Sequence, residues 1–349
     1  MNLPKRGAIS NPRNRFEPLA IELDDEFADE ARNPETQFLR DDTQTLISYS
    51  DSPDLGFRAS VNPYRGCEHG CAYCYARPYH EYLGFSAGLD FETRIMVKLS
   101  APELLRRELS SPKWQPQVVA MSGVTDCYQP IERKLEITRR CLEVLAEFQN
   151  PVAIVTKNYL VTRDLDILER LAAVRAASVN LSITTLDAEL ARRLEPRASL
   201  PRHRLQAVAR LSAAKIPVRV LIAPVVPGLN DHEIPAILSA ARKSGAQDAG
   251  YVLLRLPYGV KEIFSDWLAT HLPGSQNKIL DRIRATRGGA LNDPRFGSRM
   301  RGEGSEAEAI RRLFEVAVAH EGFNKGRMSL SSAAFRNPYG EQLEFGLQS

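Results

Sequence analysis

The strongest constraint on the fold is a regular alternation between short apolar, β-branched segments and longer segments with helical periodicity. The apolar segments lie at residues 57–62, 117–123, 151–157, 177–186, 217–227 and 250–257. The clearest helical pattern covers residues 132–149, and another covers residues 201–215. Strands that alternate with helices are typical of a parallel sheet built from right-handed βαβ units. The sequence therefore predicts an α/β fold with six such units.

The regions on either side of these units differ from them in composition. Residues 1–55 are rich in Pro, Asn, Asp, Glu and Arg and show weak periodicity, which predicts an extended, partly disordered N-terminal arm. Residues 56–260 contain the predicted core. Residues 261–349 predict a small C-terminal extension that is mainly helical, with helices near residues 265–271, 277–286 and 305–320.

Basic residues gather in two segments outside the predicted core. One is the start of the N-terminal arm, and the other is residues 287–304, which include Arg295, Arg299 and Arg301. Guanidinium groups bind phosphate and carboxylate well, but runs of charge alone are weak signals. The arm is thus open to two interpretations, a solvated tail or a nucleic-acid-binding element. The arginine segment is either an anion site or a solvated loop.

Composition is typical of a soluble enzyme. The chain has 349 residues, of which 43% are apolar, and a net charge of +3 that decides nothing about partners. No apolar run approaches the length of a membrane span, and the N-terminus lacks the core of a signal peptide. An odd number of cysteines, five, does not suit a disulfide framework. We expect a cytoplasmic monomer in a reducing compartment, with no membrane association.

Three of the cysteines lie close together, and their pattern carries most of the chemistry. Cys67, Cys71 and Cys74 form the spacing C-x3-C-x2-C just after the first apolar segment. Thiolates select iron–sulfur clusters, zinc or copper. A [4Fe–4S] cluster normally takes four cysteines, whereas the other two here, Cys127 and Cys141, lie more than 50 residues downstream. Three ligands from one loop predict a cluster with one iron open to a small molecule.

Two other interpretations of the cysteine triplet stay open. A zinc ion would need His69 as its fourth ligand, but structural zinc sites usually combine two separated pairs of ligands. Cysteines are also often buried without any metal. If a cluster is present, a non-enzymatic iron–sulfur redox or sensor protein is the alternative to an enzyme. Such a protein needs neither an open iron nor six βα units.

The motif resembles that of the radical S-adenosylmethionine (SAM) superfamily, because Cys67, Cys71, Tyr73 and Cys74 match its C-x3-C-x-aromatic-C signature. The resemblance covers about residues 55–260 and is greatest to the spore photoproduct lyase-like branch, in an uncharacterised bacterial subgroup. It implies a partial (β/α)6 TIM-like barrel and a [4Fe–4S] cluster on the three cysteines. It also implies reductive cleavage of SAM to methionine and a 5′-deoxyadenosyl radical, with flavodoxin or ferredoxin as a reductant.

The resemblance also implies where SAM binds. In such barrels the site lies at the carboxyl ends of the strands. Small and polar groups there would contact the methionyl part, the ribose and the adenine, with a lysine near the carboxylate. The residues that match are Tyr73, Ser122, Thr125, Asp126, Lys157, Ser182, Glu195 and Arg204. Each has an ordinary structural alternative, such as a helix cap for Asp126 or Glu195 and a solvated surface position for Lys157.

One departure from the lyase pattern limits the resemblance. The hydrogen-donating cysteine of that enzyme precedes its Thr-Ser-Asp segment, and this chain has Gly123 at the nearest equivalent place. Cys127 is the candidate for a relocated donor, with a buried inert thiol as the alternative. Cys141 lies on the apolar side of a predicted helix and is expected in the core. The substrate therefore stays open among nucleic acids, nucleotides, small molecules and proteins.

Overall fold

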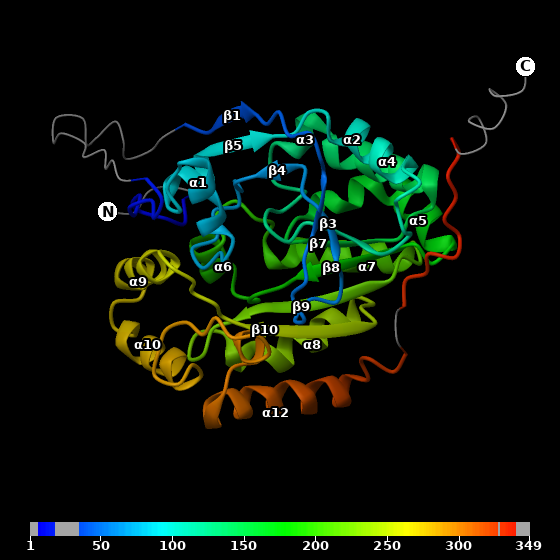
Figure 1. The fold of residues 1–349 in the computed structure, drawn as a ribbon. Helices are drawn as coiled ribbons and strands as arrows, with labels where there is room; N and C mark the ends of the chain where they lie inside the picture. Colours follow the sequence, from blue (N-terminus) through cyan, green and yellow to red (C-terminus); the bar gives the residue numbers. More distant parts are fainter. Residues whose placement is uncertain (1–5, 18–34, 327–328, 340–349) are drawn as a thin grey trace, which may run out of the picture.

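The computed structural model describes residues 6–17, 35–326 and 329–339, and its centre is a curved sheet of seven strands (Figure 1). The spatial order is β10-β9-β8-β7-β6-β3-β2. The strands are β2 (Ile47–Tyr49), β3 (Ala59–Val61), β6 (Val119–Met121), β7 (Val152–Thr156), β8 (Ala177–Ser182), β9 (Val218–Val225) and β10 (Asp248–Leu253).

The six predicted strands are confirmed, and they pair in parallel in the order of the sequence from β3 to β10. Most side chains of these strands are buried, as expected where helices cover a parallel sheet. In the described part of the chain, β2 and β10 form the two edges of the sheet and do not pair with each other. The fold is therefore the predicted partial (β/α)6 barrel, and all six strands direct their carboxyl ends to one rim.

Helices alternate with the strands, and several pack directly on the sheet. The α-helices up to β10 are α1 (Leu89–Thr93), α2 (Ala101–Ser110), α3 (Glu132–Leu135), α4 (Ile137–Phe148), α5 (Leu165–Ala173), α6 (Ala188–Leu194), α7 (Pro201–Ala213) and α8 (Ile234–Lys243). Short 3-10 helices are η3 (Arg77–Leu83), η4 (Tyr159–Asp164) and η5 (Asp231–Glu233).

The helix predicted over residues 132–149 is divided in two. Glu136 adopts a left-handed conformation (φ 52°) between α3 and α4. The buried carboxylate of Glu132 accepts hydrogen bonds from the backbone N–H of Thr138 at 3.1 Å and from the hydroxyl of Tyr64 at 2.5 Å. Glu132 thus satisfies a free N–H group at the start of α4, which periodicity alone does not reveal.

The region predicted as an N-terminal arm contributes two strands. β1 (Gln37–Arg40) pairs in parallel with β5 (Arg94–Val97), which also pairs with β4 (Tyr64–Arg65) in a second sheet of three strands. β2 is antiparallel to β3 at the edge of the main sheet. Residues 35–49 are therefore integrated into the fold, although the domain boundaries themselves stay predictions. Residues 1–5 and 18–34 of the predicted arm lie outside the described residues.

The C-terminal extension contains α9 (Val260–His271), α10 (Gln276–Ala285), α11 (Ser298–Arg301) and α12 (Gly304–Glu321), and α12 packs against α8. The segment before α12 also contacts the loop between β2 and β3, the two lying close together in Figure 1. There Asp54 accepts hydrogen bonds from Nε of Arg299 at 2.5 Å and from the backbone N–H of Gly297 at 2.7 Å. The extension thereby connects the two edges of the open sheet.

Across the described residues, the helices are all too short or too polar to cross a membrane.

Candidate active site

The three clustered cysteines lie on a loop that joins β4 to η3. Cys67 and Cys71 are each 7% exposed, Cys74 is partly buried, and none forms a disulfide. The buried guanidinium of Arg77 donates from Nε and Nη2 to the carbonyl oxygen of Cys71, at 3.0 and 2.9 Å. Its ion pair with Glu92 (2.5 Å) is fully buried. Arg77 therefore fixes the conformation of the loop.

The N-terminal segment packs closely on the same loop. The Glu92 carboxylate accepts hydrogen bonds from the backbone N–H groups of Gly7 (3.1 Å) and Ala8 (2.8 Å). A Cβ atom on Gly7 would lie 1.6 Å from the carbonyl oxygen of Gly70, which itself has a φ of 64°. Only glycine permits this approach of two backbone segments. Residues 6–8 thus cover one side of the cysteine loop.

The loop suits an iron–sulfur cluster better than a zinc ion. The imidazole of His69 has Nδ1 3.4 Å from Oδ2 of Asp126 and Nε2 3.2 Å from Nδ2 of Asn158, so both of its nitrogen atoms already have partners. Among the described residues, no three His, Cys, Asp or Glu side chains converge on one position for a single ion. A cluster binds each thiolate through a different iron, so it does not require such convergence.

Burial raises the pKa of all three thiols, Cys67, Cys71 and Cys74, because a thiolate is poorly solvated inside the protein. The neighbouring Asp126 raises the pKa of Cys67 further. A bound iron centre supplies the positive charge that stabilises thiolates in such surroundings, and its binding releases protons. The donor set and its burial are therefore compatible with a [4Fe–4S] cluster.

A buried polar network lies next to the loop, at the carboxyl ends of β7, β8 and β9. Nζ of Lys157 donates to Oγ of Ser182 (2.5 Å), to Oγ1 of Thr184 (3.3 Å) and to the carbonyl oxygen of Ala223 (2.9 Å). It also forms an ion pair with Oε1 of Glu195 at 3.3 Å. Lys157 thus connects polar groups that follow three neighbouring strands.

Glu195 is the centre of this network. Its fully buried carboxylate accepts hydrogen bonds from the hydroxyl groups of Tyr73 and Thr184, the latter at 2.6 Å, and it is paired with the guanidinium of Arg204. Burial opposes ionisation of Glu195, but the charges of Arg204 and Lys157 outweigh it and hold the pKa of the carboxyl below its usual value. The network therefore contains one anion and two cations.

Asp126 joins the network to the cysteine loop. Its carboxylate accepts hydrogen bonds from Oγ1 of Thr156 at 2.7 Å and from the backbone N–H of Lys157 at 2.8 Å. Burial opposes ionisation here too, but the nearby His69 outweighs it and keeps the pKa of Asp126 below its usual value. Asp126 therefore positions both the start of the loop and the backbone of Lys157.

The predicted cofactor-binding residues fall into two groups. Tyr73, Lys157, Ser182, Glu195 and Arg204 contact one another directly or through one partner, and Asp126 adjoins them. The other two residues, Ser122 and Thr125, contact backbone groups outside this network. Oγ of Ser122 accepts a hydrogen bond from the backbone N–H of Cys127. Oγ1 of Thr125 donates to the carbonyl oxygen of Tyr64 at 3.2 Å.

Cys127, the predicted hydrogen donor, lies in the main hydrophobic core with no exposed surface. Its backbone N–H donates to Ser122, and its carbonyl oxygen accepts a hydrogen bond from Oγ1 of Thr138 at 2.6 Å. Burial and the nearby Asp126 raise the pKa of the thiol. A catalytic role for Cys127 stays a prediction. Cys141 is buried in the same core, as expected for a structural position.

Several contacts at the site were not found from the sequence. Glu92 and Asn158 hold the cysteine loop and His69, and each lies in a segment without a recognised motif. Thr184 differs from these two residues, because it follows Ser182 by two positions and the alternation along the strand indicates from the sequence that both face the same side.

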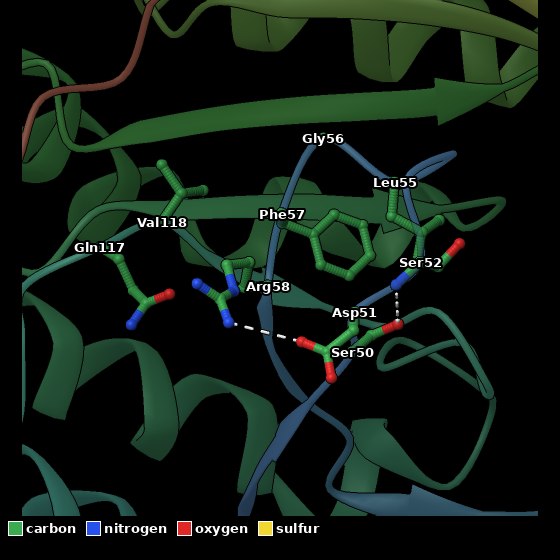
Figure 2. A pocket seen from close by; sticks show the side chains of 9 residues that line it. All are labelled: Ser50, Asp51, Ser52, Leu55, Gly56, Phe57, Arg58, Gln117 and Val118. Atoms are coloured by element: carbon green, nitrogen blue, oxygen red, sulfur yellow. Dashed lines mark hydrogen bonds and ion pairs between the residues drawn. The ribbon is translucent and has the colours of Figure 1, made fainter.

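One surface hollow is separate from this site (Figure 2). It has a volume of about 560 Å³, and its lining includes Arg58, Gln117 and Val118, which directly precede β3 and β6. It therefore opens where those strands begin, whereas the cysteine loop and Lys157 lie where strands end. An ion pair between Arg58 and Asp51 (3.4 Å), both exposed, is its main charged feature.

Comparison with known proteins places the chain in a family. The model of the radical SAM superfamily matches residues 61–241, more than half of the chain. The chain belongs to the radical SAM superfamily. Its core is thus of the class that the cysteine signature indicated.

Relatives and solved structures agree with this assignment. An uncharacterized protein of Mycobacterium tuberculosis is 37% identical over 221 residues, covering 63% of this chain and 65% of the relative. One of Methanocaldococcus jannaschii is 29% identical over 178 residues, covering 51% and 64%. The matched region thus spans slightly less than two thirds of these relatives.

Among solved structures, spore photoproduct lyase complexed with dinucleoside spore photoproduct has a TM-score of 0.58 at 15% identity, covering 83% of this chain and 80% of that chain. A cysteine variant of the lyase with the same ligand has a TM-score of 0.61 at 16% identity, covering 90% and 87%. At this identity the likeness shows a shared fold.

Proposed function

We propose that the protein is an enzyme that reductively cleaves SAM at a [4Fe–4S] cluster held by Cys67, Cys71 and Cys74. The observation that carries the proposal is the position of three free, largely buried thiols beside a polar network at the carboxyl ends of the barrel strands. Once reduced, a bound cluster with an open iron would supply the electron for cleavage of SAM to methionine and a 5′-deoxyadenosyl radical. An iron–sulfur redox or sensor protein has no use for the neighbouring network.

The chain's own residues would bind and orient SAM. Lys157 offers a cation for the SAM carboxylate, and its present contacts with Ser182 and Thr184 hold the ammonium group in place. Glu195 offers an ionised acceptor beside Tyr73, and Arg204 keeps that acceptor charged and fixed. Asp126, together with the smaller groups of Ser122 and Thr125, lines the end of β6.

Nucleic acid is the substrate class that we propose. Aromatic side chains are exposed next to the cysteine loop, including Tyr79 (54% exposed) and Tyr82 (68%) on η3. Phe16 stacks on Tyr82 with ring centroids 4.9 Å apart, and the guanidinium of Arg15 lies 3.6 Å from the ring centroid of Tyr258. Exposed aromatic rings among arginines form platforms on which bases stack. The solved lyase with the similar fold also holds a dinucleoside ligand.

The remaining parts of the proposal concern the setting of the reaction. A cytoplasmic monomer would receive electrons from flavodoxin or ferredoxin, since a thiolate-ligated cluster is best kept in a reducing compartment. Cys127 is retained as a candidate hydrogen donor, and its burial requires that the hydrogen atom pass from its thiol to the substrate radical through another side chain.

The decisive experiment measures 5′-deoxyadenosine. Anaerobically reconstituted protein should bind about four irons per chain and, once reduced with dithionite, convert SAM to 5′-deoxyadenosine and methionine. Zinc in place of iron would refute the cluster. An intact, reduced cluster that leaves SAM uncleaved would favour the redox or sensor alternative.

The substrate class is tested separately by binding of a single-stranded oligonucleotide, followed by fluorescence anisotropy. Tyr82→Ala should weaken binding about tenfold, because stacking of one base contributes roughly 1–3 kcal/mol. Tyr49→Ala is a matched control, since Tyr49 is 67% exposed but lies on the edge strand β2. Equal effects of the two changes, or none, would contradict nucleic acid as the substrate.

A further inference from the structure

Arg255 lies on the rim of the barrel, in the segment that follows the last strand. It follows β10 by two residues and lies between Leu254 and Leu256. Both leucines are buried in the same apolar cluster as Cys71 and Tyr73. The segment after the last strand is therefore packed directly against the cysteine loop, and it brings Arg255 with it.

The side chain of Arg255 points toward the end of the cysteine loop. Its guanidinium carbon lies 5.1 Å from the ring centroid of Tyr75, the residue immediately after Cys74. The Tyr75 hydroxyl donates to the carbonyl oxygen of Gly123, which follows β6. The loop, β6 and β10 thus meet around one guanidinium group.

Among the described residues, no carboxylate forms an ion pair with this guanidinium group, and the charge of Asp54, which is paired with Arg299, acts on it only from farther away. Its one hydrogen-bond contact is from Nη1 to Sδ of Met300, at 3.9 Å, and its Nε is buried without a partner. A thioether is a weak acceptor. The Nε of Arg287, a residue only 5% exposed, is also buried without a partner. Buried donors without acceptors are uncommon because they cost free energy.

Arg299 and Arg295, in the nearby C-terminal extension, are different, because each has its own acidic partner. Arg299 is bound to Asp54 at 2.5 Å, and Arg295 is bound to Asp293 at 3.0 Å. The sequence left these two residues open as either anion ligands or part of a solvated loop, and the structure pairs both with carboxylates. Burial and the adjacent Arg299 lower the pKa of Arg255, and the charge of Asp54 opposes this shift only in part.

We propose that Arg255 binds a phosphate group of the substrate beside Tyr75. The inference rests on the proposed function and names the subsite that would anchor the substrate next to the cluster loop. A phosphate suits the site because one oxygen can accept from Nε while another accepts from the neighbouring Nη. Lys157, already assigned to the SAM carboxylate, lies in a separate network with Glu195.

The test is equilibrium dialysis of the anaerobic, cluster-loaded protein against radiolabelled inorganic phosphate. Arg255→Gln should weaken phosphate binding at least about tenfold, since a hydrogen bond to a charged group contributes enough for that change. Arg255→Lys keeps the charge but loses the planar fork, and it should be intermediate. Arg312→Gln, which removes the same charge from the exposed face of α12, is the control.

Each of the next three outcomes would overturn the inference. Equal phosphate binding by the wild type and Arg255→Gln would mean an adventitious ion only. Acetate that competes as well as adenosine monophosphate would indicate a carboxylate site. If Arg255→Gln raised the dissociation constant of SAM as much as that of phosphate, the anion that Arg255 binds would belong to SAM and not to the substrate. Because phosphate binding is measured without turnover, failure of the wild type to form 5′-deoxyadenosine refutes the proposed function and not this subsite.

Discussion

Replacing Glu195 with Gln tests whether the network beside the cysteine loop depends on one buried negative charge. The substitution keeps the size of the side chain but leaves Arg204, which is 1% exposed, and Lys157 without an anionic partner. Removing one member of a buried ion pair typically costs about 3–5 kcal/mol, because the remaining charge stays desolvated. We therefore expect the free energy of unfolding to fall by about that amount.

The assay is urea unfolding of the anaerobic, cluster-loaded protein, followed by circular dichroism. Glu308→Gln is the matched control, because Glu308 pairs with Arg312 at 2.7 Å on an exposed surface. That change should cost only about 0.3–0.5 kcal/mol. A loss for Glu195→Gln no larger than that of the control would refute the reasoning.

The pH dependence of the stability difference between the wild type and Glu195→Gln is an independent test of the same prediction. Because the pKa of Glu195 is lowered on folding, its contribution is fully present above the unfolded-state pKa, near 4.3. The contribution is lost as the pH falls through the lower, folded-state pKa. The difference in stability between the wild type and Glu195→Gln should therefore be constant near pH 7 and shrink under strongly acidic conditions. A difference that instead grows on acidification would contradict the assignment of Glu195 as the buried anion.

Three further predictions concern the cluster loop and the candidate donor. Cys71→Ala should abolish bound iron and the cluster's visible absorbance, whereas Cys141→Ala should retain both, as iron analysis will show. Gly7→Ala places a Cβ atom 1.6 Å from a loop carbonyl oxygen, so it should displace the N-terminal segment and speed the loss of absorbance in air; an unchanged rate would show that the segment does not protect the loop. Cys127→Ser should leave iron content and 5′-deoxyadenosine formation intact while lowering substrate turnover, and equal turnover would remove Cys127 from the mechanism.

The sequence predicted the strand positions well because most side chains of these strands are buried, so that each strand reads as a largely apolar run. It missed β1 and β2, whose residues are largely exposed and whose composition resembles that of a loop. It also joined α3 and α4 into one helix. That break depends on the Glu132 carboxylate, whose partner Tyr64 is distant in the sequence. Long-range polar contacts of this kind leave no local pattern.

The candidate site shows the same division between local and long-range information. Cys67, Cys71 and Cys74 lie on one short loop, so spacing alone indicated their shared ligand role. Arg295 and Arg299 were equally visible as basic residues, yet each is held by an acidic partner. Arg255 was overlooked because a single arginine in an apolar segment has no distinguishing pattern.

The sequence by itself determined the α/β class, the number of βα units and the cysteine signature, because these depend on periodicity and on spacing within short segments. Only the tertiary structure decided which charges are balanced. Lys157, Glu195 and Arg204 come from separate segments and meet only when the strands align their carboxyl ends. Arg255 comes to lie beside Tyr75 in the same way, and within the described residues the packing brings no carboxylate into an ion pair with it.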